Sequence, residues 1–421
     1  MAEVKSWDWQ IGKRILADVE KIKSNNKRVD EFAASPDGER ISAPILLEDG
    51  SFAISINNEI LPNRYEYLWY LRFSPDGRLI GLVRIDDNWT LAVEGEAWEE
   101  RFEFAWHPKF SEKGGSIGLL YKKANLYGVA IDGKIWKQDY QAIRDYCLSP
   151  NGKKAAATVQ VESLKEADVF GFFEGVWSLA VDGVAWGTKF VNVWHPIFSG
   201  DGKSVAAEIR TDIDDYSIAV DGKAWDKTFG CVWSPIFNPK TGKVIAPVRI
   251  GGVWRLAEEG EIIWEKEYNQ LWNPKFSPDG AKIAAIASPK FGKWTIAVDD
   301  SPWKLNMDEM VLEPIFSPDS RRVAAVVKSK NLWSIAVDGK AWGEWFKMIW
   351  NPIFSPSSQH IIAKAERGGR YFVVCDGRIA GEGFESLWNP TFSPDGEKVL
   401  LRYIKDGKYQ REVIPIGKLL G

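Results

Sequence analysis

Short apolar runs of about five residues alternate with polar turns along the whole chain. A Lys-Phe pair precedes a Ser-Pro-Asp-Gly turn at residues 277–280, and apolar runs follow at 282–287 and 294–298. Proline fixes φ for such a turn, and glycine supplies a positive φ. A second turn reads Val-Asp-Gly at residues 181–183, 220–222 and 337–339, a strong hairpin signal between apolar runs. The pattern predicts short strands joined by tight turns, with one or two helical turns at residues 16–23.

This unit returns about every 39 residues. Its clearest copies begin at Trp106, Trp194, Trp233, Trp272, Trp350 and Trp388, and weaker ones begin at Asp30, Trp69, Arg144 and Leu312. The residue before the turn, which we call the register residue, is Ser35, Ser74, Ser111, Ser149, Ser199, Asn238, Ser277, Ser317, Ser355 or Ser393. Eight intervals between these ten residues are 37 to 40 residues long, and Ser149 to Ser199 is 50. A period of about 40 residues is typical of a four-stranded propeller blade or a two-helix repeat, and the strand chemistry favours the blade.

We therefore predict an all-β fold, a β-propeller with about ten four-stranded blades, strands a to d, in one closed ring. The whole chain, residues 1–421, would form a single domain, with repeats over residues 31–421. Residues 1–30 would close the ring, because residues 7–16 resemble the end of a blade and would pair with the last one. Ten blades exceed the usual number of about four to eight. The alternative of two five-bladed rings needs a boundary near residues 192–234, where the repeats continue without interruption.

Aromatic residues keep phase with the register residues. One tryptophan of most repeats, which we call the outer tryptophan, precedes the next register residue by 13 residues. These tryptophans are Trp98, Trp136, Trp186, Trp225, Trp264 and Trp342, and Trp303 precedes its register residue by 14. An aromatic residue of the third strand comes nine residues earlier at Trp89, Tyr127, Trp177, Tyr216, Trp294 and Trp333. Most of the 22 tryptophans are thus explained by the repeat.

Composition argues against several classes of function. The net charge is −4, with 54 Lys and Arg against 58 Asp and Glu, and no basic run suggests a nucleic-acid partner. The first residues lack the pattern of a secretory signal, and the apolar runs are too short to span a membrane. Cys147, Cys231 and Cys375 lie in different repeats without a Cys-x-x-Cys spacing, as expected for core thiols in a reducing compartment. We expect a cytoplasmic protein.

No spacing typical of a catalytic or cofactor site is present. The chain has three histidines, and His107 and His195 occupy the place that Asn holds in other copies, where a side chain could bond a backbone N–H of strand a. A metal shared by these two histidines is the alternative. A single acid in each Ser-Pro-Asp-Gly turn cannot supply the six or so oxygen ligands of calcium. The sequence predicts no catalytic residue, no metal and no cofactor.

Two features could bind a protein partner. The long repeat carries its extra residues, 161–175, between strands b and c, with Phe170, Phe172 and Phe173 among the acids Glu162, Glu166, Asp168 and Glu174. An exposed apolar cluster often marks a binding site, but these rings could instead fold back on the blade. The second feature is the tryptophan that begins each clear copy, which we expect at the d-to-a connection on the same face as the insertion. Partner-binding candidates are Phe170, Phe172, Phe173, Glu174, Trp106, His107, Trp194, His195, Trp233, Trp272, Trp350 and Trp388. For the tryptophans, the large area that each ring buries favours packing between blades as the main role, and partner binding is the alternative.

The Phe-Ser-Pro-Asp-Gly phrase and the apolar strand after it resemble the repeat of WD40-like propellers of the TolB type. The Trp-x-Pro and Val-Asp-Gly-x-Ala-Trp elements and the many tryptophans are similar to the tryptophan-rich soluble subunit of transmembrane redox complexes in sulfate-respiring bacteria. That resemblance implies a cytoplasmic, cofactor-free component of an electron-transfer complex, with membrane-bound redox subunits as partners and no residue roles to transfer. We thus expect a non-catalytic scaffold or docking subunit. A small-ligand or peptide-binding sensor that uses the central channel, and an enzyme, are the alternatives.

Overall fold

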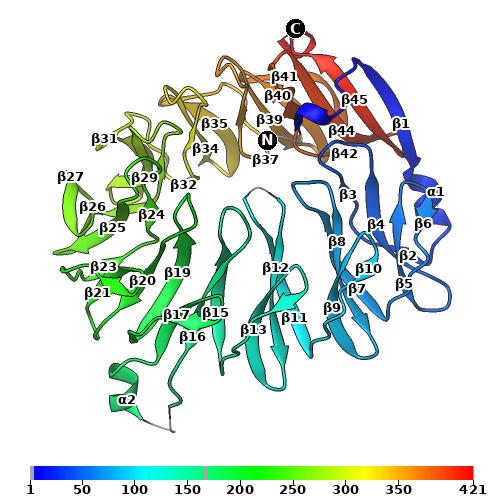
Figure 1. The fold of residues 1–421 in the computed structure, drawn as a ribbon. Coiled ribbons are helices and arrows are strands. Elements are labelled where there is room, and N and C mark those ends of the chain that lie inside the picture. Colours follow the sequence, from blue (N-terminus) through cyan, green and yellow to red (C-terminus); the bar gives the residue numbers. More distant parts are fainter. Residues whose placement is uncertain (1–3, 113, 165–167, 421) are drawn as a thin grey trace. The chain divides into compact units, whose positions relative to one another are not determined.

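The computed structural model describes residues 4–112, 114–164 and 168–420 (Figure 1). In this part of the chain the strands form ten antiparallel sheets, each ordered a-b-c-d, with strand a split in two in five of them. These sheets are the blades of a β-propeller, and the predicted fold class and number of blades are confirmed. By their contacts the blades fall into two compact units, one of residues 1–105, 317–337 and 341–421, the other of residues 106–316 and 338–340.

The first unit contains blades 1, 2, 9 and 10 and the central strands of blade 8. Its elements are η1 (Val4–Ser6), β1 (Gly12–Asp18), α1 (Val19–Ser24), β2 (Arg28–Val29), β3 (Ala33–Ala34), β4 (Ile41–Leu46), β5 (Phe52–Ile56), β6 (Glu59–Ile60), β7 (Tyr67–Phe73), β8 (Leu79–Ile85), β9 (Asn88–Val93), β10 (Glu96–Ala97), β34 (Val323–Ser329), β35 (Leu332–Val337), β37 (Met348–Ile349), β38 (Ile353–Phe354), β39 (Ile361–Arg367), β40 (Arg370–Cys375), β41 (Arg378–Phe384), β42 (Ser386–Leu387), β43 (Thr391–Phe392), β44 (Lys398–Lys405), β45 (Lys408–Pro415) and α3 (Gly417–Leu420). The predicted helical segment at residues 16–23 is strand up to Asp18 and helix from Val19.

The second unit contains blades 3 to 7 and strand a of blade 8. Its elements are β11 (Phe104–Phe110), β12 (Ile117–Lys123), β13 (Leu126–Ile131), β14 (Lys134–Ile135), β15 (Ile143–Leu148), β16 (Ala155–Gln160), α2 (Val169–Phe173), β17 (Trp177–Val181), β18 (Val184–Ala185), β19 (Asn192–Phe198), β20 (Val205–Arg210), β21 (Tyr216–Val220), β22 (Lys223–Ala224), β23 (Cys231–Val232), β24 (Ile236–Phe237), β25 (Val244–Ile250), β26 (Val253–Glu258), β27 (Glu261–Tyr268), β28 (Gln270–Phe276), β29 (Ile283–Lys290), β30 (Lys293–Val298), β31 (Ser301–Pro302), β32 (Met310–Val311) and β33 (Ile315–Phe316). The short strand β36 (Lys340–Ala341) ends blade 8.

The register residue stabilises the turn between strands a and b. The hydroxyl of Ser277 donates to the Asp279 carboxylate at 2.6 Å and accepts the Lys282 N–H at 2.9 Å. The Gly280 N–H closes the turn on the Ser277 carbonyl at 2.7 Å, with a φ of 68° at the glycine. Ser277 is buried, so its hydroxyl needs these partners. This bonding explains why a small polar residue recurs at the start of the turn.

The turn between strands c and d joins each blade to the one before it. In blade 5 the Asp221 carboxylate accepts the Val205 N–H at 2.9 Å, which caps the start of strand b. At Gly222 a Cβ would lie 3.3 Å from the ring of Trp186, the outer tryptophan of blade 4. Glycine is therefore needed here both for its φ of 84° and for the close approach of the tryptophan. The outer tryptophans thus pack between neighbouring blades.

Each hydrophobic core lies between two neighbouring sheets. One cluster combines Trp177 and Ala156 of blade 4 with Val193, Val205 and Ala207 of blade 5. Strand b is buried along nearly its whole length in blade 5, as expected for a strand covered on both faces. A blade cannot bury this surface alone, so the repeats stabilise one another.

The two ends of the chain meet in blade 10. Strand β1 pairs antiparallel with β45, and Figure 1 shows the blue β1 beside the red β45. The predicted pairing of the N-terminal segment with the last blade is confirmed, although the paired residues are Gly12–Asp18 and not residues 7–16. Arg411 of β45 donates to the carbonyl of Asp37 in blade 1 at 2.8 Å, and Tyr409 donates to the carbonyl of Gly38 at 2.9 Å. Among the described residues, the structure has no helix long and apolar enough to cross a membrane.

Candidate docking surface

None of the candidate tryptophans lies in the d-to-a connection, which corrects the prediction: Trp106, Trp194 and Trp272 lie within strand a, and Trp233, Trp350 and Trp388 lie between the two halves of a split strand a. In blade 7, Trp272 lies within β28, and the strand bulges just after it, between Trp272 and Lys275. The residue after the tryptophan has a positive φ in four continuous strands a: 57° at Tyr70, 49° at His107, 46° at His195 and 49° at Asn273. Asn and His tolerate this left-handed conformation better than most side chains do. The bulge therefore explains the residue type at His107, His195 and Asn273.

Among the residues that the structure describes, neither histidine side chain bonds the backbone of strand a, which corrects the prediction. His195 Nδ1 lies 2.9 Å from Glu208 Oε1, and this hydrogen bond raises the pKa of His195. His107 contributes through its backbone instead, since its carbonyl accepts the Tyr146 hydroxyl at 2.7 Å. Within residues 4–112, 114–164 and 168–420, no three His, Cys, Asp or Glu side chains are grouped to hold a metal ion.

Each strand-a tryptophan contacts the third-strand aromatic of its own blade. The ring-centroid distances are 6.4 Å for Trp69–Trp89, 6.1 Å for Trp106–Tyr127, 6.3 Å for Trp194–Tyr216, 5.3 Å for Trp233–Trp254, 4.9 Å for Trp272–Trp294, 6.0 Å for Trp350–Tyr371 and 5.6 Å for Trp388–Tyr409. Aromatic pairs at such distances stabilise a fold beyond the area that they bury. Trp69 and Trp233 are the most exposed of these tryptophans, at 41% and 37%, while the other five are half-buried. The tryptophans therefore pack within their own blades, and each ring stays partly accessible to solvent.

Blade 4 replaces this aromatic pair with a cation–π contact. Arg144 occupies the tryptophan position, and its guanidinium carbon lies 3.7 Å from the ring centroid of Trp177. The guanidinium also donates to the side-chain carbonyl of Asn192 in blade 5 at 2.9 Å. Trp177 is buried, at 7% exposure. Blade 4 is also the blade that carries the long insertion.

The insertion lies between β16 and β17, as predicted, and it contains the short helix α2. The Asp168 carboxylate caps this helix by accepting the Gly171 N–H at 2.8 Å. Phe172 is partly buried against the core cluster of blades 4 and 5, and Phe173 contacts it edge-on at 5.4 Å. Glu166 lies outside the described residues. The predicted alternative that the rings fold back on the blade thus applies to Phe172.

Phe170 has the opposite orientation and is 86% exposed. Val169 beside it is 58% exposed, and Leu164 is 37% exposed. We call these three residues, Leu164, Val169 and Phe170, the insertion patch. Exposed apolar clusters often mark binding sites. Phe172 anchors α2 to the blade, so the helix presents Phe170 from an ordered base.

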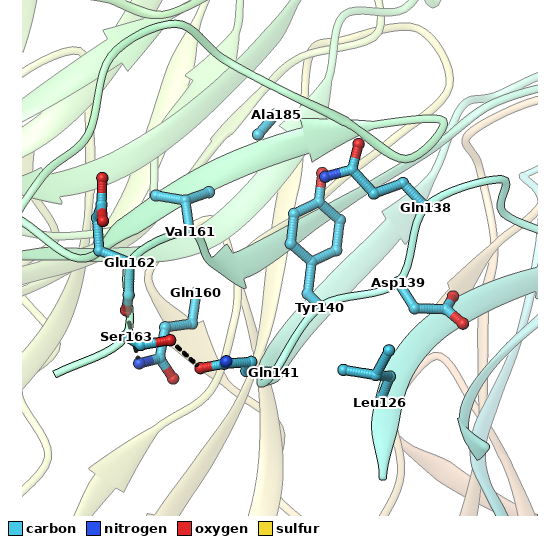
Figure 2. Close-up of a pocket in the computed structure, with 10 residues that line it drawn as sticks. All are labelled: Leu126, Gln138, Asp139, Tyr140, Gln141, Gln160, Val161, Glu162, Ser163 and Ala185. Carbon is cyan, nitrogen blue, oxygen red and sulfur yellow. Dashed lines mark hydrogen bonds between the residues drawn. The ribbon is translucent and has the colours of Figure 1, made fainter. Parts of the chain in front are cut away.

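A small cavity lies at the foot of the insertion, with a volume of about 240 Å³ (Figure 2). One wall is the end of blade 3, with Gln138, Tyr140 and Gln141, and the other is formed by Gln160 at the end of β16 and Ser163 of the insertion. The Ser163 hydroxyl donates to the side-chain carbonyl of Gln141 at 2.6 Å, which ties the two walls together. These glutamines are not predicted from the sequence, because isolated polar residues carry no recognisable motif.

Charge at the insertion is mainly negative. Glu174 caps the C-terminal end of α2, and Asp168 caps its N-terminal end. Glu162, at the start of the insertion, lies 3.6 Å from Lys189, which compensates that charge. The exposed Phe170 is therefore flanked by two acids on its own helix.

The cysteines are free, and they lie where the sequence places them. Cys147 is in β15, Cys231 in β23 and Cys375 at the end of β40. Burial raises the pKa of Cys147 to about 12 and that of Cys375 to about 12. Thiols with such a pKa are almost entirely protonated at neutral pH, so they are poor nucleophiles.

No family model and no curated protein sequence matches this chain. Among solved structures, it is similar to one described as a crystal structure of the eukaryotic initiation factor, with 13% identity over 80% of this chain and 93% of that one and a TM-score of 0.49. It is also similar to a structure of the Dos1 propeller, with 10% identity over 96% of this chain and 94% of that one and a TM-score of 0.38. Likenesses this distant say nothing about function.

Proposed function

We propose that the protein is a non-catalytic propeller scaffold that docks a protein partner through the insertion of blade 4. The observation that carries this proposal is the exposure of Phe170, 86%, on a helix held to the blade by the partly buried Phe172. An aromatic side chain presented from an ordered base loses little conformational freedom on binding. Such a residue can contribute about 2 kcal/mol or more when a partner desolvates it.

The chemistry of the insertion indicates the kind of surface that it would bind. Phe170 and Val169 supply an apolar centre, and Asp168 and Glu174 add negative charge at the two ends of α2. A partner with an apolar pocket bordered by Lys or Arg would complement both features. Charge complementarity of this kind affects mainly the association rate and its dependence on salt.

The resemblance to tryptophan-rich soluble subunits suggests a more specific role. On that basis we propose a TolB-like, cytoplasmic, cofactor-free component of a membrane-associated electron-transfer complex, with membrane-bound redox subunits as partners. The protein would hold these subunits and carry no electrons itself. Protein purified from its native source should then show no visible absorption from haem or iron–sulfur clusters.

A second candidate function is the binding of a small ligand or peptide. The cavity of about 240 Å³ between Gln138 and Ser163 favours it, since polar side chains line both walls (Figure 2). That volume lies below the range of about 300–1,000 Å³ that is typical of drug-sized ligands. A short polar side chain of the docked partner would fit the cavity better, which would make it part of the docking surface.

The test compares two exposed phenylalanines on b-to-c connections. Phe170→Ser changes the insertion patch, and Phe291→Ser changes a residue that is 94% exposed in the turn after β29 of blade 7. Partners are first captured by the wild-type protein from native membranes and identified, and the affinity of the purified partner is then measured by calorimetry. We expect Phe170→Ser to weaken binding at least tenfold, about 1.4 kcal/mol, with an unchanged melting temperature, and Phe291→Ser to bind as wild type does.

A deletion variant completes the test. Replacing residues 161–175 by a short Gly-Ser link should leave the fold intact, because the other blades lack this insertion, and should weaken binding at least as much. Normal binding by the folded deletion variant would place the docking surface elsewhere. Unfolding of that variant would show that the insertion serves packing, and Phe170→Ser would then decide the question alone.

A further inference from the structure

One position of strand b, opposite the strand-a tryptophan, differs in chemistry from blade to blade. It is apolar at Leu82, Pro247 and Ile286 and charged at Glu208, Lys364 and Arg402. Glu208 is bonded to His195, and Arg402 donates to the carbonyls of Ser35 at 2.8 Å and Asn389 at 2.6 Å. These two charged side chains therefore have structural partners.

Lys364 of β39 has a different environment. Its ammonium nitrogen lies 4.1 Å from the ring centroid of Trp350 and 4.5 Å from that of Tyr371. In the part of the chain that the structure describes, it makes no hydrogen bond and no ion pair. The two rings replace water around the nitrogen, and rings solvate the charged form less well than water does. Burial accordingly lowers the pKa of Lys364 to about 8, and the charge of Glu31 opposes the shift.

A cavity of about 260 Å³ opens onto this lysine. Besides Lys364 and Tyr371, its walls include Phe32, Trp388, Ser386 and Glu31. The aromatic walls favour an apolar or weakly polar molecule, and the Glu31 carboxylate disfavours an anion. A cavity of about 150 Å³ takes benzene, so this volume limits the occupant to roughly ten heavy atoms.

We propose that Lys364 is a covalent binding site for small, uncharged aldehydes, which it holds as imines. The lone pair of the uncharged amine attacks the carbonyl carbon, a C–N bond forms, and the π electrons move to the oxygen. Proton transfer from nitrogen to oxygen gives a carbinolamine. The hydroxyl group then takes up a proton and leaves as water. The nitrogen loses its second hydrogen as a proton, and the product is the neutral imine. Amine and aldehyde thus give imine and water, with no oxidant or reductant.

The proposal is tested on the wild-type protein by reductive trapping. The protein is incubated with butanal and sodium cyanoborohydride at pH 7, digested, and analysed by mass spectrometry for the rate of alkylation at each lysine. Lys328 is the internal comparison, because its nitrogen lies 5.3 Å from the ring centroid of Trp333 but outside this cavity. A pKa of about 8 against an ordinary 10.5 makes the neutral amine roughly 300-fold more abundant at pH 7. Lower basicity reduces nucleophilicity, roughly tenfold over this range by analogy with thiols.

We therefore expect Lys364 to react at least about tenfold faster than Lys328, with a rate that rises with pH and levels off above about 8. Glu31→Gln removes the charge that favours the ammonium form and should raise the rate at pH 7. Lys364→Arg should remove the fastest-reacting site. A rate at Lys364 equal to or below that at Lys328, or an unchanged fastest site in Lys364→Arg, would overturn the proposal. These outcomes are independent of partner binding at the insertion.

Discussion

Arg411 is the side chain that we expect to contribute most to the stability of blade 10, where the two ends of the chain meet. It is 2% exposed, and it donates to the carbonyls of Asp37, at 2.8 Å, and of Asp8. Its Nε also lies 3.0 Å from the Glu39 carboxylate. All three acceptors come from the first 40 residues of the chain, so one side chain of β45 holds both blade 1 and the segment before β1.

The variant Arg411→Met keeps the aliphatic stem and removes the charge and all donors. Removing one partner of a buried, hydrogen-bonded charge pair costs about 3–5 kcal/mol. We expect the lower end of this range, because the carbonyl of Asp37 loses its donor while Glu39 is 34% exposed and keeps its contact with Arg14. Whole domains are stable by about 5–15 kcal/mol, so this loss is large. We expect it to appear as a lower urea midpoint and as faster amide exchange in β1, Gly12–Asp18.

Arg14→Met is the matched control. Arg14 lies on β1 and binds the same Glu39, but its side chain is 46% exposed. Exposed ion pairs contribute about 1 kcal/mol or less. A loss of stability for Arg411→Met no greater than that for Arg14→Met would refute the reasoning, since burial would then not decide the contribution of these contacts. Equal exchange rates in β1 for wild type and Arg411→Met would refute it as well.

Two further predictions concern strand a. His195 should titrate with a midpoint above 6.5 in NMR, because Glu208 stabilises the charged ring, and Glu208→Gln should lower that midpoint. The pKa of His195 is higher in the folded than in the unfolded state, so the pair stabilises the fold below about pH 6.5, and this contribution is lost as the pH rises through the folded pKa. A midpoint unchanged by Glu208→Gln would contradict this prediction. Trp233 and Trp254 stack at 5.3 Å and 9°, so a double-mutant cycle with leucine should give a coupling of about 0.5–1.5 kcal/mol in urea unfolding. Additive effects would show that the rings only fill space.

The position of the insertion in the chain could be predicted from the sequence, but the orientation of its side chains could not. The insertion was visible because the interval from Ser149 to Ser199 breaks the period of the register residues. Its three phenylalanines have the same local chemistry, so the sequence could not tell that Phe172 packs against the blade while Phe170 projects from it. The exposure of each ring depends on the direction of α2 relative to the sheet. That direction is set by contacts with residues distant in the sequence.

The positions of the strand-a tryptophans show a different kind of limit. From the sequence, the tryptophan that begins each clear copy is expected at the d-to-a connection. The structure continues the strand through a bulge, with positive φ at His195 and Asn273. Pairing with strand b compensates for the interruption. The pairing partner lies in another part of the blade, so the phrase itself could not reveal the bulge.

The sequence by itself determined the blade, the number of blades and the pairing of the chain ends. These features rest on local chemistry repeated in phase: a Ser-Pro-Asp-Gly turn, an Asp-Gly turn and apolar runs of strand length. Only the tertiary structure decided which repeated residues depart from their common role. Arg402 and Lys364 occupy equivalent positions and are both cationic, yet one donates to the backbone of blade 1 and the other faces two aromatic rings and a cavity. The difference arises because Arg402 reaches the backbone of blade 1, whereas Lys364 contacts two rings of its own blade and a cavity lined mainly by blade 10, and a repeat does not encode the chemistry of its neighbour.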